Sequence, residues 1–596
     1  MIKLSDFVFK FFEEQGVDTA FMLAGGGIMH LVESLGNSSI KYVCCHHEQA
    51  CSIAAQSYSM SKNDLGLCLV TTGPGGTNAL TGLAAAYVDS TPVVFLSGQV
   101  KTADFASLRG VRQFGAQEND IVSMAKPVSK YAVIVEKPED ILYVLQKAVY
   151  MAKSGRRGPV WVDIPLDIQA AQIDEENLKQ FVPEENKVRL EKDTIKKIFD
   201  ELSKSKRPLF LVGHGLKASQ SEELFLNVQR KLKIPVVATW RELDLMDYDN
   251  EYFFGSPGLQ ANRFSNIITQ GCDLLIVLGS RLDNMITAFN EEHFAFRAKR
   301  IIVDIDKNEI EKLNMPGKLI YNCDVYDFLN EMNDYIINSH FEMHNITKWI
   351  DFCKEMKDEY PLVNEKQVED SNYTDLYKLT LGVSEYCNKE DTIVASSTSR
   401  CNTAGHMAFY HKAGQKTISS MGMGSMGFAL PSVVGAYFAS DNNRVIMFEG
   451  DGSLQLNIQE LQTIKYYDID AKMFIFSNMG YAAIATMQDR NYNGHHVGST
   501  IDSGISFPNL EKIANAYDIP YYKIETNDQI DDVVKEVMGE NGAVICEVIG
   551  SIKFDEIPKC ISFINEKGQR ESAKLENPFP FMNEKTLEEI YKKCID

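Results

Sequence analysis

The sequence predicts an α/β protein of three consecutive domains, each built on a parallel sheet flanked by helices. Two observations favour this class. The chain has 596 residues, which is well beyond one hydrophobic core. Short apolar runs also recur along it, most of them separated by helix-like segments, and many close on Gly, Ser, Thr or Asp. Such runs are typical of parallel strands buried on both faces, with ligand sites at their carboxyl ends.

The apolar runs fall into three groups of four. The first group is TAFMLAGGG, LGLCLVTTGPGG, TPVVFLSGQ and GPVWVDIPLD; the second is RPLFLVGHG, IPVVATW, CDLLIVLGS and KRIIVDID; the third is DTIVASSTS, NRVIMFEGDGS, AKMFIFSN and GAVICEVIG. Charged stretches near 173–193 and 342–370 separate the groups. We therefore expect a first domain at 1–180, a Rossmann-like middle domain at 190–345, a third domain at 370–555 and a tail at 556–596.

The charge balance limits the partners of the protein. Lys+Arg 60 against Asp+Glu 82 gives a net charge of −22, which argues against nucleic acid or a membrane surface as the main partner. The N-terminal stretch MIKLSDFVFKFFEEQGV predicts an amphipathic helix rather than a signal peptide or membrane span. The twelve cysteines form no CxxC pair, and we expect reduced thiols in a cytoplasmic protein.

A carboxylate ends one of the apolar runs of the third domain, in RVIMFEGDGSLQLN. We expect a helix from Ser453, with Leu454, Ile458, Leu461 and Ile464 on one face, and its free amides suit a phosphate. The next run ends at Asn478, 27 residues after Asp451. Parallel strands joined by one helix bring these two ends side by side. Asp451, the Asn478 side chain and a carbonyl near Gly480 are then three hard oxygens suited to Mg²⁺.

Other readings of this loop are weaker. A calcium loop beginning at Asp451 needs Gly and Glu where Leu456 and Gln462 stand. A nucleophile elbow needs Gly two residues before its Ser, but Asp451 stands two residues before Ser453 and Met423 two before Ser425. No G-x-x-x-x-G-K-[ST] motif occurs in the chain, which argues against a P-loop nucleotidase. The alternative that remains is that Asp451 only caps its helix.

The segment Gly450-Asp451-Gly452-Ser453, followed by Ser477-Asn478 at the next strand end, resembles the diphosphate-binding motif of thiamine diphosphate enzymes. The usual motif ends in two asparagines; here the first is Ser477, and the second, the metal-binding one, is present. The resemblance implies thiamine diphosphate held through Mg²⁺, with the third domain as the diphosphate-binding domain. The first domain then binds the aminopyrimidine ring of the cofactor.

A glutamate in the first domain fits this assignment. HHEQACSIAAQSYS resembles the R-H-E-Q-A-A-x-x-A-A-x-G-Y-A stretch of the acetohydroxyacid (acetolactate) synthase branch, which places Glu48 in the position that activates the cofactor. The alternative is a glutamate that only complements a helix dipole. In such enzymes the glutamate and the metal site belong to different subunits. The resemblance therefore implies a homodimer as the minimal unit, with a homotetramer as the larger alternative.

The resemblance covers nearly the whole chain, through LAGGGIMHLVES, TTGPGGTNALTGLAAAYVDS, VRQFGAQENDIVSMAKPVSKYA and SSMGMGSMGFALPSVVGA. By this match Gly424 offers its carbonyl to the aminopyrimidine, and Met426 is an apolar wedge under the cofactor; the alternative for Met426 is ordinary core. The catalytic residues implied are Glu48, Gln117, Gly424 and Met426. The cofactor-binding residues implied in the first and third domains are Gly25, Gly26, Glu48, Pro74, Asn78, Ser397, Thr398, Gly424, Met426, Gly450, Asp451, Gly452, Ser453, Asn478, Gly480 and Tyr481.

The middle domain carries two glycine-rich turns. Gly213 and Gly215 belong to a G-x-G-x-x-A match, which lacks the usual acidic residue about twenty positions on. In the resembling family this domain often binds FAD through a G-x-R-x-D loop and an acidic strand end. The residues that fit are Gly279, Arg281, Asp283, Asp304 and Asp306. We therefore expect FAD, the alternative being a domain that holds no ligand, as in simple decarboxylases.

Departures from the family pattern concern the substrate. Ala116 replaces a phenylalanine and enlarges the pocket, Met487 aligns with the tryptophan that favours 2-oxobutyrate, and Leu166 replaces a lysine. Arg400 lies in an altered loop, where it either meets an anionic substrate group or pairs with a surface carboxylate. GGGIMH, CCHHEQAC and RQFGAQENDIV are also similar to homologues associated with surface-polysaccharide synthesis, some of which transfer an acetyl unit from pyruvate to a nucleotide-linked keto-sugar.

These features together predict an enzyme that decarboxylates a 2-oxo acid, pyruvate, and transfers the two-carbon unit to an acceptor carbonyl. The alternatives are a decarboxylase that releases an aldehyde, a flavin-linked pyruvate oxidase and a non-catalytic paralogue. The tail either folds over the active site or packs on a neighbour.

Overall fold

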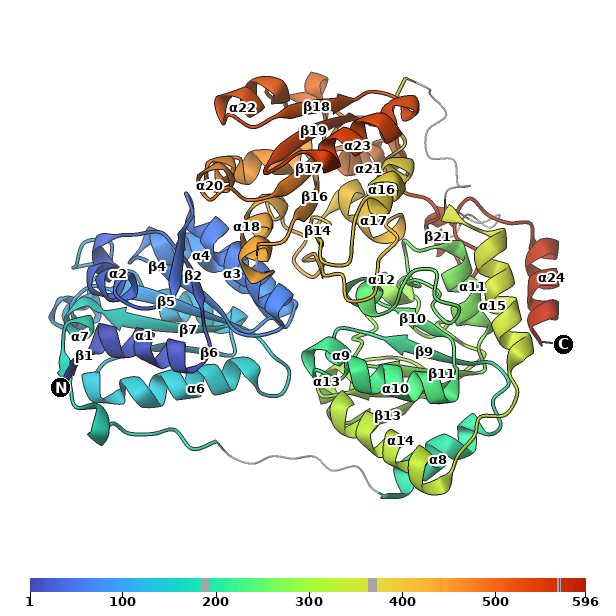
Figure 1. Cartoon of the computed structure of the whole chain (residues 1–596), viewed down its shortest axis with the longest axis horizontal. Helices are drawn as coiled ribbons and strands as arrows, with labels where there is room; N and C mark the ends of the chain where they lie inside the picture. Colours follow the sequence, from blue (N-terminus) through green and yellow to red (C-terminus); the bar gives the residue numbers. More distant parts are fainter. Residues whose placement is uncertain (184–191, 363–371, 441, 565–567, 569, 596) are drawn as a thin grey trace.

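The chain folds into three parallel α/β sheets that follow one another along the sequence, which confirms the predicted fold class (Figure 1). The computed structural model describes residues 1–183, 192–362, 372–440, 442–564, 568 and 570–595. In the described part of the chain, no helix has both the length and the hydropathy to cross a membrane.

The first sheet has six strands in the order β3-β2-β4-β5-β7-β6. Its strands are β2 (Thr19–Met22), β3 (Lys41–Cys44), β4 (Gly66–Val70), β5 (Val93–Gln99), β6 (Tyr131–Ile134) and β7 (Val160–Pro165). Its helices are α1 (Leu4–Glu14), α2 (Met29–Gly36), α3 (Glu48–Lys62), α4 (Pro74–Val88), α5 (Ile121–Ala125), α6 (Ile141–Lys153) and α7 (Leu166–Gln169). The predicted N-terminal amphipathic helix is α1, which buries its apolar residues. The short strand β1 (Ile2–Lys3) pairs with β8 (Gln172–Ile173) beside it.

The middle sheet has five strands in the order β10-β9-β11-β12-β13. Its strands are β9 (Pro208–Val212), β10 (Val236–Ala238), β11 (Leu274–Leu278), β12 (Lys299–Asp304) and β13 (Leu319–Asn322). Its helices are α8 (Lys192–Leu202), α9 (Gly215–Ala218), α10 (Glu222–Leu232), α11 (Arg263–Gly271), α12 (Asn284–Thr287), α13 (Lys307–Glu311), α14 (Val325–Ser339) and α15 (Thr347–Glu359).

The tail packs on this middle domain. Its hairpin is β20 (Ser562–Ile564) and β21 (Arg570–Ser572), and its helix is α24 (Glu584–Ile595). Ile590 and Tyr591 of α24 are buried in the middle-domain core, and Figure 1 shows the helix alongside α15. Of the two positions expected for the tail, packing on a neighbouring domain is the one observed.

The third sheet has six strands in the order β15-β14-β16-β17-β19-β18. Its strands are β14 (Thr392–Val394), β15 (Thr417–Ile418), β16 (Val445–Gly450), β17 (Ala471–Ser477), β18 (Tyr521–Ile524) and β19 (Val544–Ile549). Its helices are α16 (Leu376–Glu385), α17 (Ser399–Met407), α18 (Ala429–Ala439), α19 (Asp451–Leu454), α20 (Glu460–Tyr466), α21 (Ala482–Tyr492), α22 (Leu510–Ala516) and α23 (Ile530–Gly539).

The helix expected from Ser453 differs in its start and its continuity. It begins at Asp451, and a 3₁₀ turn at Gln455–Asn457 separates α19 from α20. Asn457 lies in that turn and donates a hydrogen bond of 2.7 Å to the Gly427 carbonyl. The predicted apolar face is nevertheless correct, because Leu454, Leu461 and Ile464 are buried and Ile458 packs against the same core.

The first and third domains pack directly on each other through α3 and α18. A Cβ on Gly435 would lie 2.1 Å from the Ala54 carbonyl oxygen, so the two helices approach as closely as backbone allows. Ser57 Oγ donates to the Ser432 carbonyl at 2.8 Å across this contact. One apolar core therefore runs through both domains.

Candidate functional site

Three neighbouring parallel strands of the third sheet, β14, β16 and β17, end at one edge and carry the polar loop predicted to bind a cation. Asp451 follows β16 and Asn478 follows β17, so the structure brings these two residues together as expected. The Asp451 carboxylate accepts hydrogen bonds from the backbone N–H groups of Gly452 at 2.8 Å, Asn478 at 3.0 Å and Met479 at 2.8 Å.

Asp451 is buried, with 7% of its surface exposed. Burial raises its pKa to about 6, although the backbone N–H groups that it accepts from lower the pKa. A carboxylate that has lost solvent in this way is stabilised by a nearby cation. The Asn478 side-chain oxygen and the Gly480 carbonyl would complete a set of hard oxygens, which fits Mg²⁺. This set contains one carboxylate, consistent with the finding that no cluster of three His, Cys, Asp or Glu exists among the described residues.

Small residues and close packing shape the loop after β16. A Cβ on Gly452 would lie 2.4 Å from Cε1 of Tyr481, so only glycine fits beneath that ring. Tyr481 in turn lies edge-on to Phe507. Ser453 Oγ accepts a hydrogen bond of 2.8 Å from the Gly427 N–H, which joins this loop to the loop expected under the cofactor.

The segment before α18 carries Gly424 and Met426. Gly424 has a φ of 62°, in the left-handed region that favours glycine, and its N–H donates to the Ser420 carbonyl at 2.8 Å. Ser397 Oγ, at the end of β14, donates to the Ser425 carbonyl, while its neighbour Thr398 precedes α17. Met426 is 37% exposed, so the alternative that it is ordinary core of this chain is wrong.

Glu48 opens α3 in the first domain and is 8% exposed. Its Oε2 accepts a hydrogen bond of 3.0 Å from Nδ2 of Asn78, one turn into α4. Pro74 is the first residue of that helix, where its missing N–H costs nothing. The structure therefore brings three of the expected first-domain residues, Glu48, Pro74 and Asn78, to the starts of two adjacent helices.

Gly25 and Gln117 lie at the same ends of the first sheet. A Cβ on Gly25 would lie 2.5 Å from Thr71, whereas Gly26 beside it has open space. Gln117 is exposed and has a φ of 65°, and its carbonyl packs on Gly73, which follows β4. The backbone at Gln117 is thus held in a strained conformation next to the start of α4.

Among the described residues, no hydrogen bond joins Glu48 directly to Asp451, Asn478 or Gly480. Glu48 bonds Asn78 of its own domain, and Asp451 bonds its own strand-end loops. The nearest links are Asn457 Nδ2 to Gln49 Oε1 at 3.2 Å and the His46 N–H to Glu460. Large apolar side chains instead lie exposed around both halves: Met29, Leu108, Val111, Phe114, Met423, Met426, Met479, Ile484, Met487, Tyr492, Val497 and Ile501.

Arg400 is buried, with 3% of its surface exposed. Its guanidinium donates to the carbonyls of Ser551 at 2.9 Å and Ile552 at 2.8 Å, and to Thr486 Oγ1 at 3.2 Å. The alternative of a surface ion pair is therefore wrong, because Arg400 is buried and these partners are uncharged. Arg400 ties α17 to α21, the helix that carries Met487.

A cavity of about 400 Å³ lies in the middle domain, and residues of the first and third domains also line it. Six of the seven residues expected to hold FAD line it: Gly213, Gly215, Gly279, Arg281, Asp283 and Asp304; Asp306 is not among its lining residues. A Cβ on Gly215 would lie 2.5 Å from Gly279 Cα, so the two glycine turns pack backbone to backbone. Removing side chains here lets a ligand approach the main chain closely.

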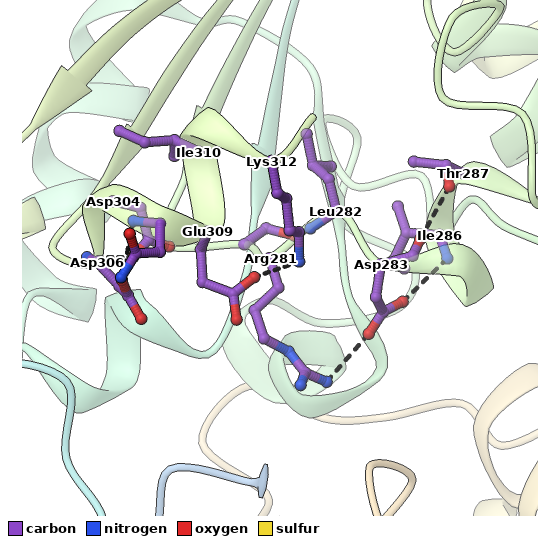
Figure 2. Close-up of polar contacts among 12 residues, drawn as sticks. Arg281, Leu282, Asp283, Ile286, Thr287, Asp304, Asp306, Glu309, Ile310 and Lys312 are labelled. Carbon is purple, nitrogen blue, oxygen red and sulfur yellow. Dashed lines mark hydrogen bonds and ion pairs between the residues drawn. The ribbon is translucent and has the colours of Figure 1, made fainter. Parts of the chain in front are cut away.

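Polar groups of this cavity are shown in Figure 2. Arg281 Nη2 donates to Asp283 Oδ2 at 3.0 Å, and Asp283 Oδ1 caps α12 through the N–H groups of Met285 and Ile286. Asp304, at the end of β12, accepts from the Asp306 N–H at 2.9 Å, and burial raises its pKa to about 6. Asp306 Oδ2 also accepts a hydrogen bond of 3.0 Å from Nη1 of Arg156 in the first domain.

Some lining residues were not anticipated from the sequence. Arg241 Nη1 donates to the Asp89 carbonyl at 2.8 Å, and Asp89 Oδ1 accepts from the Gly422 N–H at 3.3 Å. His214, Arg156 and Arg241 line the cavity, together with Asp89 and Gly422. Arg156 and Arg241 belong to no motif recognised in the sequence, and these residues meet because three domains close around one space.

The parallel-sheet domains and the strand-end loop with its buried carboxylate are those of a cofactor-dependent α/β enzyme. Models of the thiamine pyrophosphate enzyme family match the chain in three parts: the N-terminal TPP binding domain at residues 2–124, the central domain at 195–332 and the C-terminal TPP binding domain at 399–548. The chain belongs to the thiamine pyrophosphate enzyme family.

Similar proteins specify the branch. The acetolactate synthase large subunit of Cyanidium caldarium is 30% identical over 89% of this chain and 90% of its own length. The acetolactate synthase isozyme 2 large subunit of Escherichia coli (strain K12) is 29% identical over 90% of this chain and 93% of its own length. The probable acetolactate synthase large subunit of Methanocaldococcus jannaschii is 30% identical over 92% of each. The chain is thus an acetolactate synthase-like, thiamine diphosphate-dependent enzyme.

Proposed function

We propose that this enzyme uses thiamine diphosphate and Mg²⁺ to decarboxylate pyruvate and to transfer the two-carbon unit to an acceptor carbonyl. The observation that carries the proposal is the buried Asp451 carboxylate beside Asn478 at neighbouring strand ends. Similarity to acetolactate synthases over about nine-tenths of the chain supports the reaction type.

Each half of the site then has a task. Bound thiamine diphosphate supplies the electron sink for loss of CO₂ from a 2-oxo acid. Asp451, Asn478 and Gly480 would hold the Mg²⁺ that neutralises its diphosphate. Glu48 would share a proton with a ring nitrogen of the bound aminopyrimidine, and its hydrogen bond from Asn78 would fix the carboxyl group in place. Gly424 would orient the same ring through its carbonyl, and Gln117 would face the substrate.

The acceptor is a second pyruvate or a nucleotide-linked keto-sugar. Ala116 and Met487 favour the larger acceptor, because they stand where the family has a phenylalanine and a tryptophan. Both are exposed, with Met487 at 57% on the outer face of α21. Arg400 donates a hydrogen bond to Thr486 Oγ1, one residue before Met487, and so ties α21 to α17.

One assay separates these acceptors. Purified protein receives thiamine diphosphate, Mg²⁺ and pyruvate alone, and CO₂ and acetolactate are followed together. One acetolactate and one CO₂ for every two pyruvates consumed means that pyruvate is donor and acceptor. Slow pyruvate consumption that rises on addition of a keto-sugar nucleotide identifies the sugar as acceptor. CO₂ without a ligation product, or with peroxide, would instead identify a decarboxylase or an oxidase and refute the transferase proposal.

We further propose that the middle-domain cavity binds FAD. Two packed glycine turns, a buried carboxylate at a strand end and arginines from two domains suit a dinucleotide with a diphosphate. Flavin absorbance of the purified protein, with and without added FAD, tests this. Asp304→Ala should weaken FAD binding, and a protein that takes up no flavin under any condition would refute it.

The enzyme is proposed to be a homo-oligomer, with a dimer as its smallest active form. Glu48 and Asp451 share no hydrogen bond among the described residues, and large apolar side chains near them in the sequence are exposed. Apolar patches of this kind mark interaction surfaces. Sedimentation or light scattering at assay concentrations tests the oligomeric state, and an active monomer would refute it.

A further inference from the structure

A buried polar network lies beneath the segment that carries Gln117, and its residues bind neither the proposed cofactors nor the metal. The neighbouring strands β5 and β7 place Ser97 opposite Asp163, and both side chains are fully buried. Ser97 Oγ donates to Asp163 Oδ1 at 2.6 Å. Trp161 Nε1 donates to Ser97 Oγ at 2.8 Å, so the Ser97 hydroxyl both donates and accepts.

The other oxygen of Asp163 meets Gln99, two residues after Ser97 and therefore on the same face of β5. Gln99 Nε2 donates to Asp163 Oδ2 at 3.1 Å and to the Asn119 carbonyl at 2.8 Å. Gln99 Oε1 accepts from the Val100 N–H at 3.0 Å, which fixes the orientation of the amide. Gln99 is 4% exposed. One buried amide thus links the carboxylate to the backbone two residues from Gln117.

The bond to Asn119 holds a strained segment. Gln117 has a φ of 65°, a left-handed conformation that is strained for a non-glycine residue. Asn119 Nδ2 donates to the Gly73 carbonyl at 3.3 Å, and a Cβ on Gly73 would lie 2.4 Å from the Gln117 carbonyl oxygen. The Gln117 backbone is therefore pressed between Gly73 on one side and the Gln99–Asn119 bond on the other.

We propose that Asp163 and Gln99 are positioning residues that hold Gln117 in its strained conformation facing the substrate. This inference rests on the proposed role of Gln117 at the site. The Asp163 carboxyl group accepts from both Ser97 and Gln99, and so it directs the Gln99 amide N–H groups toward Asn119. The position of Gln117 is thereby set from the interior of the sheet, although its own side chain is exposed.

The sharpest test is Asp163→Asn, which keeps size but changes hydrogen bonding. An asparagine can satisfy Ser97 through its oxygen, and its NH₂ then faces the Gln99 NH₂. Gln99 must turn over, and the bond to Asn119 is lost. We expect kcat with pyruvate to fall about 10- to 100-fold, since displacement of a positioned group by about 1 Å has such an effect. Thiamine diphosphate affinity should change little.

A double-mutant comparison separates positioning from general damage. If Asp163 acts through Gln117, then Asp163→Asn adds little to the loss already caused by Gln117→Ala. Losses that multiply would overturn the proposal. If Gln117→Ala alone retains full activity, the proposed role of Gln117 in the reaction fails. This outcome differs from losses that multiply, which would overturn only the positioning role of Asp163.

Two further variants keep the proposal testable if Asp163→Asn folds poorly. Gln99→Met removes the bond to Asn119 directly and should reproduce the loss and its non-additivity with Gln117→Ala. Ser97→Ala is the control, because it removes the other donor to Asp163 and leaves Gln99 in place; kcat should stay within about twofold. Amide hydrogen exchange at residues 115–121 should accelerate in Gln99→Met and not in Ser97→Ala. Equal exchange in both variants would overturn the proposal.

Discussion

Glu48 is the residue on which the proposed chemistry depends most directly. Glu48→Gln keeps the side-chain shape and its contact with Asn78 but cannot exchange a proton with the cofactor ring. We expect turnover to fall by at least about 100-fold, a typical loss for a removed acid–base group, with cofactor affinity retained. Steady-state rates and titration of thiamine diphosphate measure the two effects. Glu33→Gln, at an exposed site of α2, is the control, and full activity of Glu48→Gln would remove Glu48 from this role.

The pKa of Asp451 makes cation binding depend on pH. Because burial raises this pKa to about 6 without a cation, protons compete with Mg²⁺ below that pH. The carboxylate is ionised above about pH 6, so we expect affinity to be flat there. Below it, affinity should fall by about tenfold per pH unit. Titration of Mg²⁺ with thiamine diphosphate between about pH 5 and pH 8 measures this dependence.

Asp451→Ala is the matched variant for that measurement. It should bind Mg²⁺ and cofactor weakly at every pH, and its thermal unfolding should change less than its cofactor affinity. Unchanged cofactor affinity in this variant, or a pH-independent Mg²⁺ affinity in the parent protein, would contradict the assignment of Asp451 as a metal ligand.

Residues were predictable where a local pattern and a topological rule sufficed. Asp451 and Asn478 follow successive buried runs, and the meeting of parallel strand ends brings them together. The partners of Arg241 and Arg400 were not predictable from any pattern, because they lie on other segments. Arg400 bonds carbonyls about 150 residues away, and Arg241 bonds the first domain. Only the folded chain shows such contacts.

Among the secondary-structure elements, some strands were predictable from the sequence and others were not. Each of the twelve apolar runs forms a strand, whereas five strands of the three sheets had no such signal: β3, β6, β13, β15 and β18. All five lie at sheet edges. An edge strand has one neighbour and partial cover, as in the mostly exposed β3, so its sequence needs no continuous apolar run.

The α3–α18 contact depends on the absence of a side chain at Gly435. Gly435→Ala would put a methyl group 2.1 Å from the Ala54 carbonyl oxygen, and both helices must shift. We expect a loss of about 1–3 kcal/mol of stability, as for other overpacked cores, measured by urea or thermal unfolding. Gly36→Ala is the control, since a Cβ there meets nothing within 4 Å. Equal stability of the two variants would mean that the helix contact yields easily.

In the whole molecule, some faces of the three domains are covered by other parts of the chain and others are exposed. The tail helix α24 covers the middle domain, and α3 and α18 cover each other. The faces that carry Gln117 on one side and Met426 and Met487 on the other remain exposed in the single chain. A second copy of the chain is the simplest cover for both, because a two-fold axis would place each half-site against its complement.

Mixed dimers test this arrangement directly. Glu48→Gln and Asp451→Ala should each be inactive alone. When the two variants are co-expressed with different tags, a mixed dimer has one site with both changes and one site with neither. Random pairing makes half of all dimers mixed, so about a quarter of the sites regain full activity. Rates per site after tandem affinity purification of the mixed species should approach half of the parent rate.

The control for this experiment pairs Glu48→Gln with the double variant Glu48→Gln/Asp451→Ala, in which no arrangement of subunits yields a complete site. Any activity there reports contamination or reversion. If instead each site were built from one chain, the mixed dimers of the single variants would stay as inactive as their parents. Restored activity thus requires that Glu48 and Asp451 meet across the subunit boundary, and its absence in properly formed mixed dimers would show that they do not.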